Sequence, residues 1–171
     1  MIRFTKDIRP DFLDFSEEVK MTLDKIYAQL ADSWTNHMPF NQLLGFKITF
    51  CDKDKAEVHF DWDEKLVGNK LQNILHGGVT ASALDLVGGV VAAANIIAQL
   101  DDHSKENLIK NLGKLGTIDL RTDFLRPGRG EKFIATSRII RSGNKVAVAR
   151  MELHNQDGVH IAFGTGTYMV G

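Results

Sequence analysis

One stretch of the sequence limits the possible folds more than any other. Residues 74–100 are rich in Ala, Leu and Val, show no period of two, and carry a single charge, Asp85. A helix that is apolar on every side belongs in the middle of a protein, where other elements cover it. Gly88 and Gly89 each cost about 1 kcal/mol of helix propensity, but they allow close backbone approach. We therefore predict a buried central helix over 74–100.

The segments on both sides of this helix have the pattern of half-buried strands, in which apolar residues alternate with others. The expected strands are 44–50, 56–62, 118–124, 133–139, 145–154 and 159–170. The first two form a hairpin, and glycine-containing turns at 126–130, 142–144 and 155–158 separate the last four. This order predicts an α+β fold with an antiparallel sheet around the central helix.

Two further segments complete the expected organisation. Over 11–34, apolar residues recur every three or four positions, which predicts an amphipathic helix ending before Pro39. The polar segment 101–114 is expected to be a surface connection with a helical turn at 104–112. With 171 residues, the chain has the size of one domain, which we divide into an N-terminal helical extension, 1–38, and a main unit, 39–171.

Composition excludes several classes of partner. The net charge of −1 provides no field that would attract nucleic acid or anionic lipid. The only cysteine, Cys51, excludes an internal disulfide and a thiolate zinc cluster. No long apolar run is expected to cross a membrane, and the charged first ten residues do not resemble a signal peptide, so we expect a cytoplasmic protein. The histidines lack zinc-helix spacing, so no metal site is expected. Apart from His76, they are His37, His59, His103, His154 and His160.

Several short motifs fall at defined places in this pattern. They are LLGF at 43–46, Gly68-Asn69, LHGGV at 75–79, Asp85, TID at 117–119 and FLRP at 124–127. Together they resemble the hotdog fold and, more narrowly, the PaaI-type acyl-CoA thioesterases. The resemblance runs from Phe40 to the C-terminus, about three-quarters of the chain.

The resemblance implies an enzyme that hydrolyses medium-chain, long-chain or aryl acyl-CoA to the free acid and CoA, without a cofactor. It also implies a homodimer or a dimer of dimers with a shared acyl tunnel. The all-round apolar central helix supports this assembly independently, because one sheet covers only one side of it.

Three residues of the central segment carry the expected chemistry. Gly77 and Gly78 lie where a loop becomes a helix, so their N–H groups lack intrahelical acceptors. We expect the Gly77 N–H to hold the thioester oxygen, a contact that contributes about 3–4 kcal/mol in the transition state. Gly78 is expected to line the substrate-binding site next to it. Asp85 is expected to act as general base or nucleophile. The alternative is an aspartate that reaches solvent or pairs with an arginine.

Four polar residues are expected to support these groups. His76 is expected to orient nearby backbone rather than transfer a proton. The resemblance assigns to Thr117 the role of orienting water, facing Asp85 across a dimer interface; otherwise it is an ordinary strand residue. Asn69 lies one position earlier than the asparagine of many relatives, and Asn73 is the nearby substitute for holding the carbonyl or water.

Basic turns and the glycine pair suggest where the ends of the substrate lie. Two turns carry basic residues that suit the phosphates of CoA. One turn holds Arg126, Arg129 and Lys132, and the other holds Arg141 and Lys145. The alternative is that these are ordinary solvent-exposed charged turns. Gly88, together with Gly89, is expected to leave room on the helix for an acyl chain.

Two other functions fit the same pattern. A hotdog hydratase or dehydratase uses a histidine with an acidic partner, whereas the spacing of His76 and Asp85 favours hydrolysis. A non-catalytic acyl-CoA binding module would keep the apolar channel and the basic turns without needing Asp85. Fold alone does not separate them.

Overall fold

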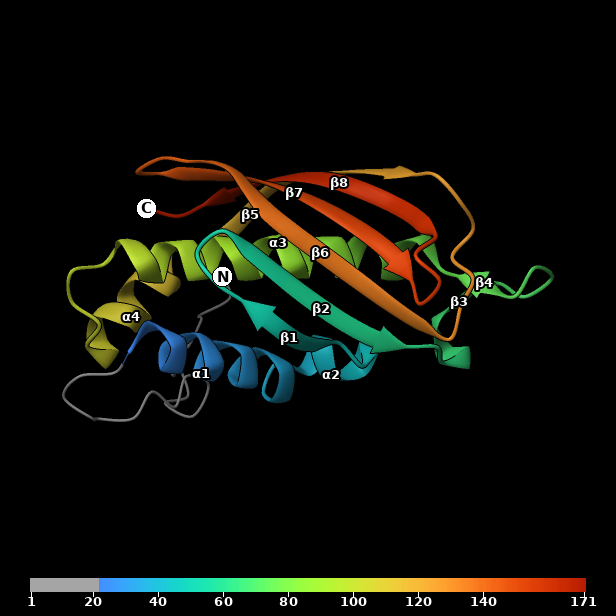
Figure 1. Ribbon diagram of the computed structural model, residues 1–171, viewed down its shortest axis with the longest axis horizontal. Helices are drawn as coiled ribbons and strands as arrows, with labels where there is room; N and C mark the ends of the chain where they lie inside the picture. Colours follow the sequence, from blue (N-terminus) through green and yellow to red (C-terminus); the bar gives the residue numbers. More distant parts are fainter. Residues whose placement is uncertain (1–21) are drawn as a thin grey trace, which may run out of the picture.

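A six-stranded antiparallel sheet curves around one long helix, α3, in the computed structural model, which describes residues 22–171 (Figure 1). The strand order is β1-β2-β6-β7-β8-β5, so β1 and β5 are the sheet edges. The strands are β1 Lys47–Cys51, β2 Lys55–Asp61, β5 Gly116–Phe124, β6 Lys132–Ser142, β7 Val146–Asn155 and β8 His160–Met169. The α+β fold expected from the sequence is confirmed.

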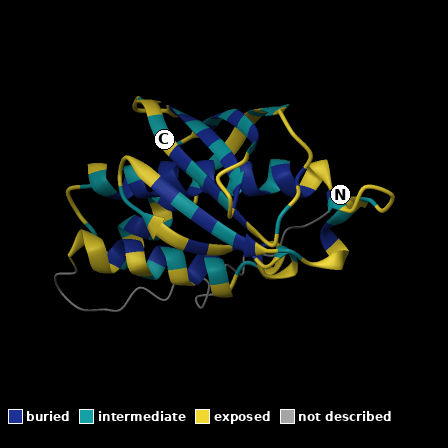
Figure 2. Cartoon of the chain, turned by 45° about the vertical axis from the view of Figure 1, so that its right-hand side comes forward, coloured by how far each residue is buried: buried dark blue, intermediate teal, exposed yellow. Residues whose placement is uncertain are grey.

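Helix α3, Gly77–Gln99, forms the centre of the fold. Its inner residues Leu84, Val87 and Val91 are fully buried, and Figure 2 shows buried residues alternating with partly buried ones along the strands that cover it. Among the described helices, α3 is the one whose length and composition would suffice to cross a bilayer, but most of that stretch is buried inside the fold. Its apolar composition follows from that burial.

The inner face of the sheet uses small residues where it lies against α3. Ala147 and Ala149 on β7 are fully buried, and Ser137 on β6 donates a hydrogen bond of 2.8 Å from Oγ to the Val87 carbonyl. This buried bond attaches the middle of the helix to the sheet. It therefore fixes which face of α3 packs on the sheet and which face points away from it.

The N-terminal helices cover the other side of the core (Figure 1). Helix α1, Leu23–Asn36, packs on β1 through Ile26 and Leu30, which are fully buried. The expected helix over 11–34 is therefore seen in its second half, and its beginning lies outside the described residues. Because α1 shares the core of the sheet, we treat the 1–38 and 39–171 division as a sequence prediction only.

Several boundaries differ from the sequence expectation. Pro39–Leu44 forms a short helix, α2, which ends at Gly45 with φ 71°, so β1 starts at Lys47 rather than at residue 44. Ile74–Leu75 is a strand, β4, that pairs with β3, Val67–Asn69, so the central helix begins at Gly77 rather than at residue 74. A single 3₁₀ turn, Glu64–Leu66, precedes β3. The helical turn expected at 104–112 is helix α4, Lys105–Leu112.

Candidate active site

The start of α3 presents one free backbone donor. His76 precedes the helix, and its Nδ1 accepts a hydrogen bond of 2.9 Å from the Gly78 N–H. Within residues 22–171, the exposed Gly77 N–H has no acceptor. The first N–H groups of a helix also lie at the positive end of its dipole. His76 thus orients the backbone, as expected, and Gly77 rather than Gly78 is the group free to bind an oxyanion.

The β3–β4 hairpin holds this helix start in place. The His76 N–H donates to the Leu66 carbonyl at 2.8 Å, and the Leu75 N–H donates to the Gly128 carbonyl at 3.0 Å. A Cβ on Gly68 would lie 2.5 Å from the His76 Cα, so only glycine permits this approach. The sequence pattern did not reveal the hairpin, because its strands have three and two residues.

The carboxylate of Asp85 has a hydrogen-bond partner on the edge strand β5. Thr117 Oγ1 on β5 donates a hydrogen bond of 2.9 Å to Asp85 Oδ1 of the same chain. The expectation that Thr117 approaches Asp85 of another subunit is therefore wrong. Strand β5 lies beside α3 in one chain because it joins the sheet at β8, an order that the sequence does not reveal.

We predict that Thr117→Val lowers kcat about tenfold with little change in KM, because the hydroxyl orients the Asp85 carboxylate and a lost hydrogen bond to a charged group costs about 1.5–3 kcal/mol. Steady-state kinetics will measure this effect. Thr117→Ser keeps the hydroxyl and is the matched control. Equal losses in both variants would assign the effect to packing instead.

An apolar cavity of about 290 Å³ opens beside Asp85 and Thr117. We call it the Asp85 cavity. Helix α3 and the sheet supply Ser82, Asp85, Leu86, Gly89, Leu115, Gly116, Thr117 and Tyr168, and the N-terminal helices supply Trp34, Met38, Phe40 and Asn41. The sequence did not indicate the last four, since their contribution depends on how α1 and α2 pack on the core.

The space beside Gly88 is occupied, so its expected role as a channel-lining residue is wrong. A Cβ there would lie 2.1 Å from Tyr168 Oη and 3.1 Å from Met151 Sδ. Tyr168 Oη donates to the Asp85 carbonyl at 3.2 Å, and burial, followed by the Asp85 charge, raises the pKa of Tyr168, so the phenol keeps its proton. It is Gly89, one position later, that faces the cavity.

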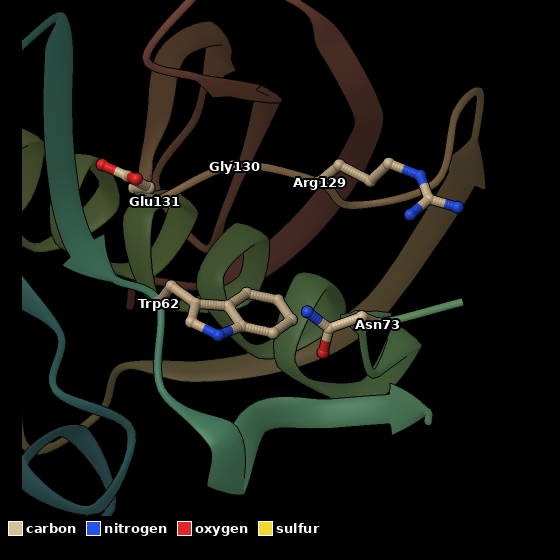
Figure 3. A pocket seen from close by; sticks show the side chains of 5 residues that line it. All are labelled: Trp62, Asn73, Arg129, Gly130 and Glu131. Atoms are coloured by element: carbon tan, nitrogen blue, oxygen red, sulfur yellow. The ribbon is translucent and has the colours of Figure 1, made fainter. Parts of the chain in front are cut away.

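A second recess, of about 330 Å³, lies close to the helix start. We call it the Trp62 recess. Figure 3 shows the Trp62 indole and the Asn73 amide pointing toward each other across it, with Arg129, Gly130 and Glu131 on the opposite wall. Arg129 Nη1 donates to the Gln72 carbonyl, which links the arginine turn to the β3–β4 hairpin.

The remaining predicted binding residues lie apart from these groups. Arg126 Nη1 donates to the His160 carbonyl at 3.0 Å, which gives it a structural contact. Arg141 and Lys145 flank the β6–β7 turn, whose residues 142–144 meet the C-terminal end of α3. Asn69 Oδ1 accepts from Leu71 and Gln72 N–H groups and so shapes the hairpin turn rather than the site.

Cys51 has no feature of a nucleophile. Its Sγ–H donates to the Tyr27 carbonyl at 3.6 Å, and burial, followed by Asp52, raises the pKa of the thiol to about 11. A thiol with such a pKa stays protonated and unreactive near neutral pH.

Two histidines that are separate in the sequence meet on the outer face of the sheet. The rings of His154 and His160 stack with centroids 4.4 Å apart and an interplanar angle of 18°, and Glu152 lies beside them. Sequence spacing did not reveal this cluster. Because imidazole lone pairs lie in the ring plane, nearly parallel stacked rings do not direct them at one ion, so we assign no metal to it.

We predict that His154 makes the fold sensitive to acid. Burial, and then His160, lowers the pKa of His154 below that of the unfolded chain. Its neutral form therefore stabilises the fold above about pH 6.5, and this contribution is lost as the pH falls below that value. In thermal melts, the decrease in Tm between pH 7 and pH 5 should be smaller for His154→Gln than for the wild type. His37→Gln, on an exposed residue, should keep the wild-type slope; parallel slopes in all three proteins would contradict the assignment.

The comparisons with known proteins agree with this geometry. The family model "Thioesterase superfamily" matches residues 72–162, just over half of the chain. This segment contains the helix start, Asp85 and Thr117. The chain belongs to the thioesterase superfamily, and its fold is the hotdog fold.

Particular relatives extend the similarity to the N-terminal helices. The chain is 46% identical over 151 residues to "Medium/long-chain acyl-CoA thioesterase YigI" of Escherichia coli (strain K12), which covers 88% of this chain and 97% of that protein. It is 52% identical to a solved thioesterase-superfamily protein from Shewanella oneidensis, with a TM-score of 0.83 and coverage of 87% and 97%. A thioesterase family protein from Silicibacter pomeroyi, 23% identical with a TM-score of 0.66 and coverage of 85% and 99%, shows the same fold.

Proposed function

We propose that this protein hydrolyses medium-chain and long-chain acyl-CoA thioesters to the free acid and CoA, as a PaaI-type member of the superfamily. The observation that carries the proposal is the Asp85–Thr117 pair in the lining of an apolar cavity. The pair supplies a reactive carboxylate, and the cavity suits an alkyl chain. The name of the Escherichia coli relative supports the same substrate class. The cytoplasmic location expected from the sequence stays a prediction.

The oxyanion donor and the carboxylate that serve one substrate come from two copies of the chain. Gly77 and Asp85 are eight residues apart on α3, which separates them by about 12 Å along the helix axis. A thioester carbonyl has to lie about 3 Å from each group, so one chain does not provide both. If two α3 helices lie antiparallel about a twofold axis, Gly77 of one subunit faces Asp85 of the other.

The edge strand β5 fits the expected interface. It pairs with β8 on one side only, and Ile118, Phe124 and Leu125 on and after it are 56%, 58% and 45% exposed. An open edge with exposed apolar residues is a template for pairing with another strand. Because β5 also carries Thr117, an interface along this edge passes through the active site.

The chemistry follows from the two groups. The Gly77 N–H stabilises the negative charge that develops on the thioester oxygen. In one route the Asp85 carboxylate takes a proton from water while the water oxygen bonds to the carbonyl carbon, the C–S bond breaks, and the CoA sulfur receives the proton. In the other route a carboxylate oxygen bonds to the carbon, CoA thiolate leaves, and water hydrolyses the resulting anhydride.

The polar end of CoA fits the Trp62 recess of the subunit that supplies Gly77. The recess borders the hairpin that leads into His76 and Gly77, and it offers an indole face and the Arg129 guanidinium. Aromatic faces stack on nucleobases, and arginine binds phosphate. We therefore propose Arg129, rather than Arg141 and Lys145, as the phosphate contact.

A CoA-release assay with acetyl-, octanoyl- and palmitoyl-CoA tests the proposed function. We expect turnover of the two longer thioesters and little turnover of acetyl-CoA. Tight binding of octanoyl-CoA without release of CoA would favour a binding module instead. Sedimentation of the active enzyme at micromolar concentration should show a dimer or larger assembly, whereas an active monomer would refute the shared site.

A further inference from the structure

We propose that Trp34 on helix α1 and Gly89 on α3 set the length of acyl chain that the enzyme accepts. The inference rests on the proposed thioesterase function and adds to it a specificity role for a helix that precedes the first strand. It begins with the position of Gly89. Asp85 and Gly89 are four residues apart, so they lie on the same face of α3, one turn from each other.

Gly89 faces the cavity between two rings. A Cβ built on Gly89 would lie 3.9 Å from Trp34 Cζ3 and 3.9 Å from Tyr168 Cε1, which is ordinary van der Waals contact. A side chain at this position therefore fits at its base and projects into the Asp85 cavity. In the native chain this space is available to a substrate that enters past Asp85.

Trp34 forms a wall of the same space directly beside Gly89. The residue is only 9% exposed, and its ring closes the cavity next to this position. Phe40, also in the lining, is 57% exposed and so lies near the surface. An acyl chain that passes Asp85 and Gly89 thus meets the Trp34 indole, which limits further extension.

The wall is fixed rather than adaptable. Buried Asn41 on α2 donates from Nδ2 to the Trp34 carbonyl at 2.8 Å. One residue along, Thr35 Oγ1 accepts a 3.0 Å hydrogen bond from the Ile48 N–H of β1. These two bonds join the end of α1 to α2 and to the sheet, so the position of the indole is determined before substrate binds.

The test compares the chain-length profiles of three folded variants with that of the wild type. The measurement is kcat/KM for saturated acyl-CoA substrates from butyryl to palmitoyl, with Tm measured for each protein. Gly89→Leu should shorten the preferred chain, because each methylene that no longer fits lowers kcat/KM roughly fourfold, while butyryl-CoA turnover changes little. Trp34→Leu should shift the optimum to longer chains. Leu43→Ala, an exposed α2 residue outside the cavity lining, should keep the wild-type profile.

A binding arm keeps this inference separate from the proposed function. Calorimetric titration of octanoate, decanoate and palmitate into each protein reports the cavity length without turnover. The fatty acid that binds most tightly should be shorter in Gly89→Leu and longer in Trp34→Leu than in the wild type. If Gly89→Leu does not fold, Gly89→Val and Trp34→Phe provide smaller changes of the same two walls. Unchanged profiles in folded variants of both residues would overturn the inference, even with an active wild type. An inactive wild type whose fatty-acid binding still shifts would overturn the function alone.

Discussion

Asp85→Asn is expected to lower kcat about 100-fold or more and to leave Tm equal or higher. Activity falls because the amide neither accepts a proton nor attacks the thioester carbon. Stability is kept because the change removes a half-buried negative charge from an apolar helix, which relieves its desolvation. The introduced amide would retain an oxygen that can accept the hydrogen bond from Thr117.

The measurement pairs steady-state kinetics with thermal melts of the same samples. Asp101→Asn removes an exposed carboxylate just beyond the end of α3 and should leave both quantities near wild type. Wild-type turnover in the Asp85 variant would remove it from the mechanism. A large drop in Tm would instead assign Asp85 a structural role.

Gly88→Ala and Gly89→Ala are expected to have opposite effects on stability, although they make the same change at neighbouring positions. The new methyl group at residue 88 would lie 2.1 Å from Tyr168 Oη, so the buried phenol has to move and its bond to the Asp85 carbonyl is weakened. Overpacking of this kind costs about 1–3 kcal/mol, or a Tm loss of roughly 5 °C in a chain of this size.

At residue 89 the methyl group meets only ordinary contacts, at 3.9 Å. The gain in helix propensity, up to about 1 kcal/mol, should therefore keep or raise Tm. Thermal melts of the two variants side by side measure the difference. Equal Tm changes would show that the helix is not rotated as described, and that Tyr168 does not occupy the space beside Gly88.

The sequence predicted those parts of the fold that follow from local periodicity. The central helix and the six strands each have a pattern that one segment carries by itself, and Asp85 stood out because it is the only charge among apolar neighbours. The helix boundary was predicted less well, because Ile74 and Leu75 continue the apolar run although they belong to a two-stranded hairpin.

The parts of the site that depend on tertiary packing could not be predicted from local sequence patterns. Gly88 and Gly89 look alike in the sequence, and only the rotation of α3 against Tyr168 decides which one faces the cavity. The pairing of Thr117 with Asp85 in one chain requires the strand order, which places β5 beside β8. Trp34 belongs to the cavity only because α1 folds back onto the core.

The most direct test of the central claim is the structure of a complex with an acyl-CoA ketone, in which a methylene replaces the thioester sulfur and hydrolysis is blocked. We predict that the ketone oxygen lies about 3 Å from the Gly77 N–H of one subunit. The carbonyl carbon should face Asp85 and Thr117 of the partner, with the alkyl chain in the Asp85 cavity. A ketone held by the side chains of His76 or Asn73 without a contact to Gly77, or bound within a single chain, would contradict this claim.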